Sequence, residues 1–149
     1  GRIVMKVVVQ RVLNASVEVN KQVVGKIDSG LLVFVGFTHN DNISNIKYIV
    51  NKIVNLRIFD DSNGVMNLSA KELNKQILAV SQFTLYGDVS KGNRPSYINS
   101  LNYEEANKLY DLFVEELRNT SLKVETGIFR SDMKVNLIND GPITIIIEK

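Results

Sequence analysis

The chain has 149 residues, of which 44% are hydrophobic and 23% are charged. These proportions are ordinary for a folded protein, and the length suits one domain with its own core. Because the sequence has no cysteine, a thiol nucleophile, a thiolate zinc site and a disulfide framework are all excluded. The net charge of +2 does not by itself demand a nucleic-acid partner, although Lys91, Arg94 and Arg130 are candidates for a local basic patch.

Targeting signals are not apparent in the sequence. Its apolar runs are shorter than the about 18 residues needed to span a membrane, and the start lacks the three regions of a signal peptide. We therefore expect a cytoplasmic protein. Residues 1–4 precede Met5, where a strand pattern begins, so we expect them to be a cloning remnant and residues 5–149 to form a single domain.

Four segments rich in β-branched residues predict strands in the first quarter of the chain, at residues 6–12, 16–19, 22–27 and 30–36. The last segment is apolar throughout, which predicts a central strand covered on both faces. In the first segment, alternation places Arg11 with Val7 and Val9 on an apolar face. A guanidinium in that position needs polar partners or a route to water.

Apolar residues at helical spacing predict two main helices, at residues 42–57 and 102–117. Asn40, Asp41 and Asn42 are the candidate N-caps of the first helix, and the second begins at Asn102. Between them, residues 77–80 predict a buried strand that continues into residues 81–85. Two more strands are predicted at 133–138 and 143–147, separated by a turn at residues 139–142. This order predicts an α/β fold with a mixed sheet and the helices on one side.

The segment at residues 81–85 is the first candidate for a functional site. Strand alternation predicts Ser81, Phe83 and Leu85 on one face, with Gln82 and Thr84 on the other. The two hydroxyl groups could hold a substrate or a water molecule, but neither has a neighbouring base that would activate it. The structural alternative is a strand end whose hydroxyl groups satisfy the backbone of a loop.

Three further features have both a functional and a structural interpretation. The loop at residues 91–97 contains two cations and an aromatic residue, which suit a phosphate or a base but also suit a solvated loop. The Gly141–Pro142 bond is either a cis bond that redirects the neighbouring carbonyl groups or an ordinary trans turn. The single histidine, His39, has no acidic partner beside it, which argues against a catalytic triad.

The segments SQFTL at residues 81–85 and NDGPIT at residues 139–144 together resemble the paired motifs of the D-aminoacyl-tRNA deacylases. The segments at residues 5–12 and 91–96 match the same family in order and spacing. The resemblance implies an α/β fold with β/β/α layers, the two main helices lying on one side. It also implies a homodimer without metal or cofactor that hydrolyses the ester of D-aminoacyl-tRNA. Glycine charged on a non-cognate tRNA is a second implied substrate.

The resemblance also implies roles for individual residues. It implies that the Gly141–Pro142 bond is cis, that Arg11 locks this turn, and that each subunit inserts the turn into its partner's active site to exclude L-amino acids. Thr84 matches a residue once considered a nucleophile, but the ribose 2′-hydroxyl of the tRNA can instead assist water while backbone N–H groups stabilise the oxyanion. The implied pocket residues near the ester are Ser81, Gln82 and Phe83, and those around the adenosine are Phe129, Met133 and Asn139.

The sequence departs from the family pattern at a few positions. Arg130 and Ser131 stand where the family usually carries Gly and Ala, which alters the adenine pocket and makes Arg130 a candidate phosphate contact. Tyr97 stands where Phe is common. Two alternatives to an enzyme remain open at this point: a non-catalytic tRNA-binding module of the same fold, and a purely structural dimerisation domain.

Overall fold

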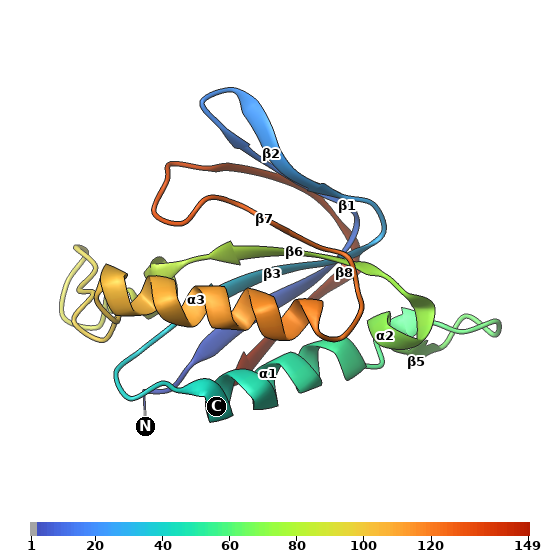
Figure 1. Ribbon diagram of the computed structural model, residues 1–149, viewed down its shortest axis with the longest axis horizontal. Coiled ribbons are helices and arrows are strands. Elements are labelled where there is room, and N and C mark those ends of the chain that lie inside the picture. The colour runs from blue at the N-terminus through green and yellow to red at the C-terminus, as the bar shows by residue number, and fades with distance from the viewer. Residues whose placement is uncertain (1–2) are drawn as a thin grey trace.

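A curved six-stranded sheet forms the centre of the computed structural model, which describes residues 3–149 (Figure 1). Residues 1–2, half of the segment expected to be a cloning remnant, lie outside the described residues. The strand order is β2-β1-β3-β6-β7, and β8 pairs with the other edge of β1. A separate two-stranded sheet is formed by β4 (Phe59–Asp60) and β5 (Met66–Leu68).

The first strand, β1 (Lys6–Val19), joins two segments that the sequence predicted as separate strands. Its first half pairs with β3 (Gly30–Gly36) and its second half with β2 (Gln22–Ile27), while β8 follows both halves. The alternation of burial is interrupted at Leu13 and Asn14, which are both exposed. At this interruption the second half of β1, together with the whole of β2, leaves the plane of β3, as Figure 1 shows.

The sheet is covered on both faces, which gives the β/β/α layering. Alternate residues of β3 and β6 (Gln76–Ser81) point to opposite layers, which is why residues 30–36 and 77–80 are apolar, as predicted. On one face, Leu31 and Val33 pack with α1 (Ile43–Asn55) and α3 (Tyr103–Arg118). On the other face, Leu32 and Leu78 pack against the folded-over half of β1 and against β8 (Lys134–Glu148).

Both predicted helices are present, and both lie on the same side of the sheet (Figure 1). The Asn42 side chain accepts hydrogen bonds from the Ser44 and Asn45 backbone amides. In turn, the side-chain oxygen of Asn45 accepts a hydrogen bond from the Asn42 backbone amide. The Asn102 side chain accepts from the Glu105 amide. These caps satisfy amide donors that a helix start leaves free, and of the three candidate caps of α1 the structure uses Asn42.

Two sequence predictions about strands are wrong. The strand β6 ends at Ser81, and residues Phe83–Tyr86 form a 3-10 helix, η1, so the strand alternation expected for residues 81–85 does not exist. The cause is Tyr86, whose buried hydroxyl donates to the carbonyl groups of Gly36 and Val4 at 3.1 and 2.7 Å. Likewise, residues 139–142 do not separate two strands, because β8 runs through them with a bulge opposite Arg11.

The short elements α2 (Ala70–Leu73) and β7 (Val124–Thr126), like β4 and β5, were not predicted. The strand β7 lies parallel to β6, which in turn lies parallel to β3, so three neighbouring strands run in the same direction. Within residues 3–149, every helix is too short or too polar to cross a membrane.

Candidate active site

A pocket of about 450 Å³ opens at the carboxyl ends of the parallel strands β3, β6 and β7. Ligand sites are common at this end of a parallel sheet, because the connections that leave the strands diverge there. The strand register places two sides of the pocket next to each other, because Val35 at the end of β3 pairs with Ser81 at the end of β6. The lining residues that directly follow these strands are Phe37, Gln82, Phe83, Phe129, Arg130, Ser131, Asp132 and Met133.

The structure brings five of the residues expected at the site into this one pocket: Ser81, Gln82, Phe83, Phe129 and Met133. The Phe83 ring is 56% exposed and lies edge-on to the Tyr97 ring, with the ring centroids 5.0 Å apart. The Phe129 ring packs at 5.8 Å from the ring of Tyr110, which is buried. The walls are therefore largely apolar and aromatic, a lining that suits a nucleobase.

Thr84 does not line this pocket. Its hydroxyl accepts a hydrogen bond from the Gln82 side-chain amide. His39 is exposed on a different loop, where its Nε2 lies 3.0 Å from the carbonyl oxygen of Ile98. Among the described residues that line the pocket with Ser81 there is no histidine or lysine, the side chains that most often activate a serine hydroxyl.

Sequence reasoning missed the wall formed by the start of α3. Ser100, Leu101, Tyr103 and Ala106 line the pocket on this side. The guanidinium of Arg130 lies over the Tyr103 ring, 3.6 Å from its centroid. Tyr103 directly follows the Asn102 N-cap, but nothing in the sequence links it to Arg130, which its ring contacts. The loop at residues 91–97 lies outside the lining and is exposed over most of its length.

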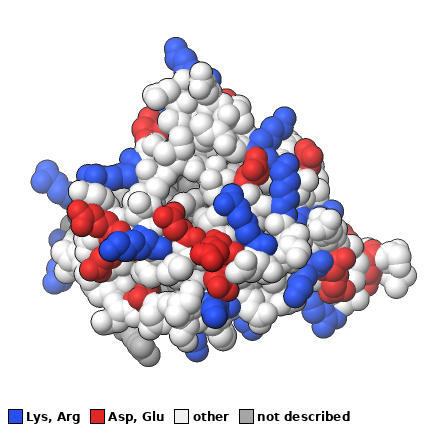
Figure 2. Space-filling view, viewed as in Figure 1, with Lys and Arg blue, Asp and Glu red and all other residues white. Residues whose placement is uncertain are grey.

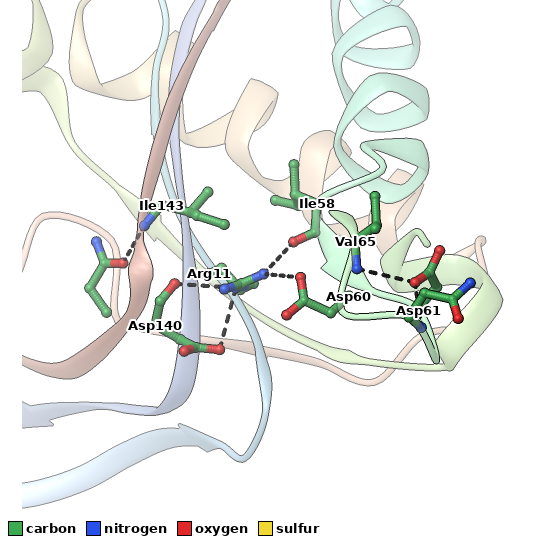
Figure 3. A network of polar contacts seen from close by, with 9 residues as sticks. Arg11, Ile58, Asp60, Asp61, Val65, Asp140 and Ile143 are labelled. Carbon is green, nitrogen blue, oxygen red and sulfur yellow. Dashed lines mark hydrogen bonds and ion pairs between the residues drawn. The ribbon is translucent and has the colours of Figure 1, made fainter. Parts of the chain in front are cut away.

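The bulge of β8 at residues 139–142, called the turn from here on, is held by Arg11, whose side chain is buried on the apolar face of β1 (Figure 3). The Arg11 Nη1 donates to the Ile58 carbonyl at 2.7 Å, and Nε donates to the Asp140 carbonyl at 3.2 Å. The carboxylates of Asp60 and Asp140 lie 3.6 and 3.3 Å from the same guanidinium. Two segments that are distant in the sequence, residues 58–60 and Asp140, thus supply the polar partners of this cation.

Asn139 also braces the turn, so the structure does not bring it into the pocket of its own chain. Its side chain accepts from the Ile143 amide and donates to the Thr144 hydroxyl, both at 2.9 Å. The Gly141–Pro142 peptide bond is cis, and both residues are exposed. Gly141 has a φ of 130°, and a Cβ atom there would lie 2.8 Å from Cγ1 of Ile143, so only glycine fits without strain.

The pocket and the turn do not meet within one chain. Arg11 pairs with Leu31 near the start of β3, whereas Ser81 pairs with Val35 near its end. Four residues of strand separate these two levels by on the order of 13 Å. The order β8-β1-β3-β6 adds three strand spacings, or roughly 14 Å, across the sheet.

The charged side chains of the described residues form no cluster suited to a metal ion, and they are mixed in sign on the face seen in Figure 2. Residues 3–149 contain no group of three or more His, Asp or Glu side chains placed to hold a metal ion. Basic and acidic side chains are interspersed over α1 and α3 on the face seen in Figure 2.

Comparisons with known proteins identify the family. A family model described as D-Tyr-tRNA(Tyr) deacylase matches residues 8–148. The chain is 57% identical over 144 residues to a D-aminoacyl-tRNA deacylase of Halothermothrix orenii, with 97% of each chain covered. It is 56% identical over 146 residues to a D-aminoacyl-tRNA deacylase of Flavobacterium psychrophilum, again with 97% of each chain covered.

Solved structures show the same fold. A protein described as the c-Myc DNA Unwinding Element Binding Protein superimposes with a TM-score of 0.91 at 39% identity, covering 97% of this chain and 98% of its own. A probable eukaryotic D-amino acid tRNA deacylase superimposes with a TM-score of 0.86 at 18% identity, covering 99% and 100% of the two chains. Together with the family model and the close relatives, these similarities establish that the chain belongs to the D-aminoacyl-tRNA deacylase family of hydrolases.

Proposed function

We propose that the pocket hydrolyses the ester of D-aminoacyl-tRNA, releasing a free D-amino acid and tRNA. One observation supports this activity most directly: the 81–83 segment meets Phe129 and Met133 in a single pocket of a chain that belongs to this family. The adenine of the terminal nucleotide would lie against Phe129 and Met133. The ester would then lie beside Ser81, Gln82 and Phe83.

The reaction in this proposal uses groups of the RNA and the protein backbone. The ribose 2′-hydroxyl of the tRNA assists a water molecule, whose oxygen forms a bond to the ester carbonyl carbon. Backbone N–H groups of the 81–84 segment stabilise the oxyanion, except that of Gln82, which donates to the Val35 carbonyl at 2.8 Å. The bond from the carbonyl carbon to the ribose oxygen then breaks, and that oxygen takes up a proton. The absence of histidine and lysine from the described lining around Ser81 supports this assignment.

Selection of the D-enantiomer would be made by exclusion. The carbonyl groups of Gly141 and Pro142 would face the α-amino group of the substrate, which leaves no space for the side chain of an L-amino acid. A clash rejects an enantiomer more strongly than a weakened attraction does. Glycine lacks the side chain that is tested, so glycine attached to a non-cognate tRNA would also be hydrolysed. Arg11 would act as a positioning residue, because it holds the Asp140 carbonyl directly before this pair.

The turn would act in the pocket of a second subunit, so the proposed enzyme is a homodimer. Within one chain the turn lies far from the pocket, at the opposite end of β3. Two apolar side chains in the strands beside the turn, Leu13 and Ile138, are 52% and 50% exposed, so a second subunit could bury them.

The activity is tested by incubating the protein with D-Tyr-tRNA, L-Tyr-tRNA and Gly-tRNA and measuring the release of amino acid. We expect release from D-Tyr-tRNA and from Gly-tRNA, and little from L-Tyr-tRNA. Equal hydrolysis of both tyrosyl esters would contradict the proposed selectivity. Tight binding of D-Tyr-tRNA without any release would instead favour a non-catalytic tRNA-binding module.

The shared site is tested by mixing two inactive variants. Phe129→Ala damages the pocket and Gly141→Ala damages the turn, so each homodimer has two defective sites. A mixed dimer has one site with an intact pocket and an intact turn, and random mixing should restore about a quarter of the wild-type rate. Dissociation and reassociation in mild denaturant allow the exchange, and sedimentation checks the oligomeric state. No recovery in mixed dimers would place the turn and the pocket of one site in a single chain.

A further inference from the structure

A stacked pair of side chains, Arg130 on Tyr103, forms one edge of the pocket. The guanidinium carbon lies 3.6 Å from the ring centroid, the separation of two planar groups in face contact. Both residues line the pocket, Tyr103 from the first turn of α3 and Arg130 from the loop after β7. Because the face of the guanidinium rests on the ring, its N–H donors are directed outward around the edge.

These donors have no acceptor in the part of the chain that the structure describes. Arg130 takes part in none of the hydrogen bonds or ion pairs found among residues 3–149. The other charged residue of the lining, Asp132, is paired with Lys134 at 3.0 Å. The pocket edge therefore presents one uncompensated positive charge, and it is held in a defined direction by an aromatic ring.

The backbone at Arg130 is also unusual. Its φ is 67°, in the left-handed region that residues other than glycine rarely adopt. Glycine, which the family usually carries at this position, would adopt this conformation without strain. In this chain the same backbone conformation carries a long cationic side chain to the pocket edge, where the Tyr103 ring supports it.

We propose that Arg130, supported by Tyr103, binds the 5′-phosphate of the terminal nucleotide of the RNA. This inference depends on the proposed function, because it takes the terminal adenosine as the occupant of the pocket. The carboxyl group of the amino acid is esterified and carries no charge, and its α-amino group is a cation that Arg130 would repel. The phosphate that joins the last nucleotide to the chain is the remaining charged group, and arginine matches its oxygens with two donors.

Calorimetric titration with adenosine and with adenosine 5′-monophosphate tests this contact without requiring turnover. A hydrogen bond to a charged partner corresponds to about a tenfold change in Kd at moderate salt. We expect the wild-type protein to bind the monophosphate about tenfold more tightly than adenosine, and Arg130→Ala to bind the two nearly equally. Arg130→Lys keeps the charge without the planar stack, so an intermediate ratio is expected.

Lys108→Ala is the matched control, because Lys108 is an exposed cation on α3 outside the pocket lining. It should keep the wild-type ratio of the two Kd values, and added salt should reduce that ratio in the wild type more than in Arg130→Ala. Equal ratios in Arg130→Ala and the wild type, or no preference for the monophosphate in the wild type, would overturn the proposal. Hydrolysis of D-Tyr-tRNA, measured in parallel, reports separately on the proposed function.

Discussion

Replacing Arg11 with methionine removes the cation that ties the 139–142 turn to the core while keeping most of the side-chain volume. Two hydrogen bonds from a charged donor to the Ile58 and Asp140 carbonyl groups are lost, each worth about 1.5–3 kcal/mol. The ion pairs add at most about 1 kcal/mol, because the side chains of Asp60 and Asp140 are 55% and 42% exposed. Relief of the desolvation of Arg11 offsets part of this loss, so we expect a net destabilisation of about 2–4 kcal/mol.

Urea denaturation of Arg11→Met and the wild type, with the midpoint and the slope fitted together, measures this change. Arg57→Met is the matched control, since Arg57 is exposed and its Nε donates to the Asn67 carbonyl at 2.9 Å. The free energy of unfolding of this control should fall by less than about 1 kcal/mol, because water replaces the hydrogen bond at an exposed site. Arg11→Lys should lie between the wild type and Arg11→Met, since an ammonium group does not match the fork of the guanidinium.

This reasoning would be refuted if the free energy of unfolding fell by less than about 0.5 kcal/mol in Arg11→Met and by the same amount in Arg57→Met. It would mean that the desolvation of the buried guanidinium cancels its hydrogen bonds, as some buried ion pairs do. Arg11 would then be retained for the conformation of the turn and not for the stability of the fold. A fall in D-Tyr-tRNA hydrolysis without loss of stability would identify that outcome.

Three other substitutions have expected effects on the free energy of unfolding. Tyr110→Phe should cost about 1 kcal/mol at neutral pH, because the buried hydroxyl donates to the Ala79 carbonyl at 2.8 Å. Burial raises the pKa of the Tyr110 hydroxyl. Its contribution to the free energy of unfolding is therefore complete below the ordinary pKa of about 10 and falls as the pH rises above it. Urea midpoints measured from pH 9 upward should fall more in the wild type than in Tyr110→Phe. Asn42→Ala removes the cap of α1 and should lower the urea midpoint by the equivalent of about 1 kcal/mol. Gly141→Ala places a Cβ atom against Ile143 at a φ of 130° and should cost about 1–3 kcal/mol in thermal unfolding.

Much of the fold could be predicted because its signals are local. The two long helices begin at asparagine caps and carry continuous apolar stripes, and residues 30–36 are apolar throughout because both faces of β3 are covered. Strand alternation placed Arg11 on the apolar face, and the structure shows that polar partners, the alternative to a route to water, hold it there. In each case, the residues that carry the signal are the residues that form the element.

The rest depended on contacts between distant segments. Residues 81–85 read as a strand, but Tyr86 bonds to the backbone of β3 and of Val4, and the chain turns into a 3-10 helix. The strand β7 is short and is defined by its pairing with β6, which no local pattern encodes. The shared pocket of the 81–83 segment and Phe129 was implied only by the resemblance. The stack of Tyr103 with Arg130 had no signal at all.

The two ends of β3 lie beside different features of this fold. At its carboxyl end the parallel neighbours diverge and leave a pocket, while at its amino end β8 bulges and exposes the Gly141–Pro142 pair. A rigid sheet keeps the pocket and the turn of one chain apart, so no loop movement that preserves the sheet unites them. A second copy, related by a twofold axis, can deliver its turn to the first pocket and receive the other in return. Under the proposed function, a monomeric variant would therefore still bind adenosine but would lose its discrimination between D- and L-esters.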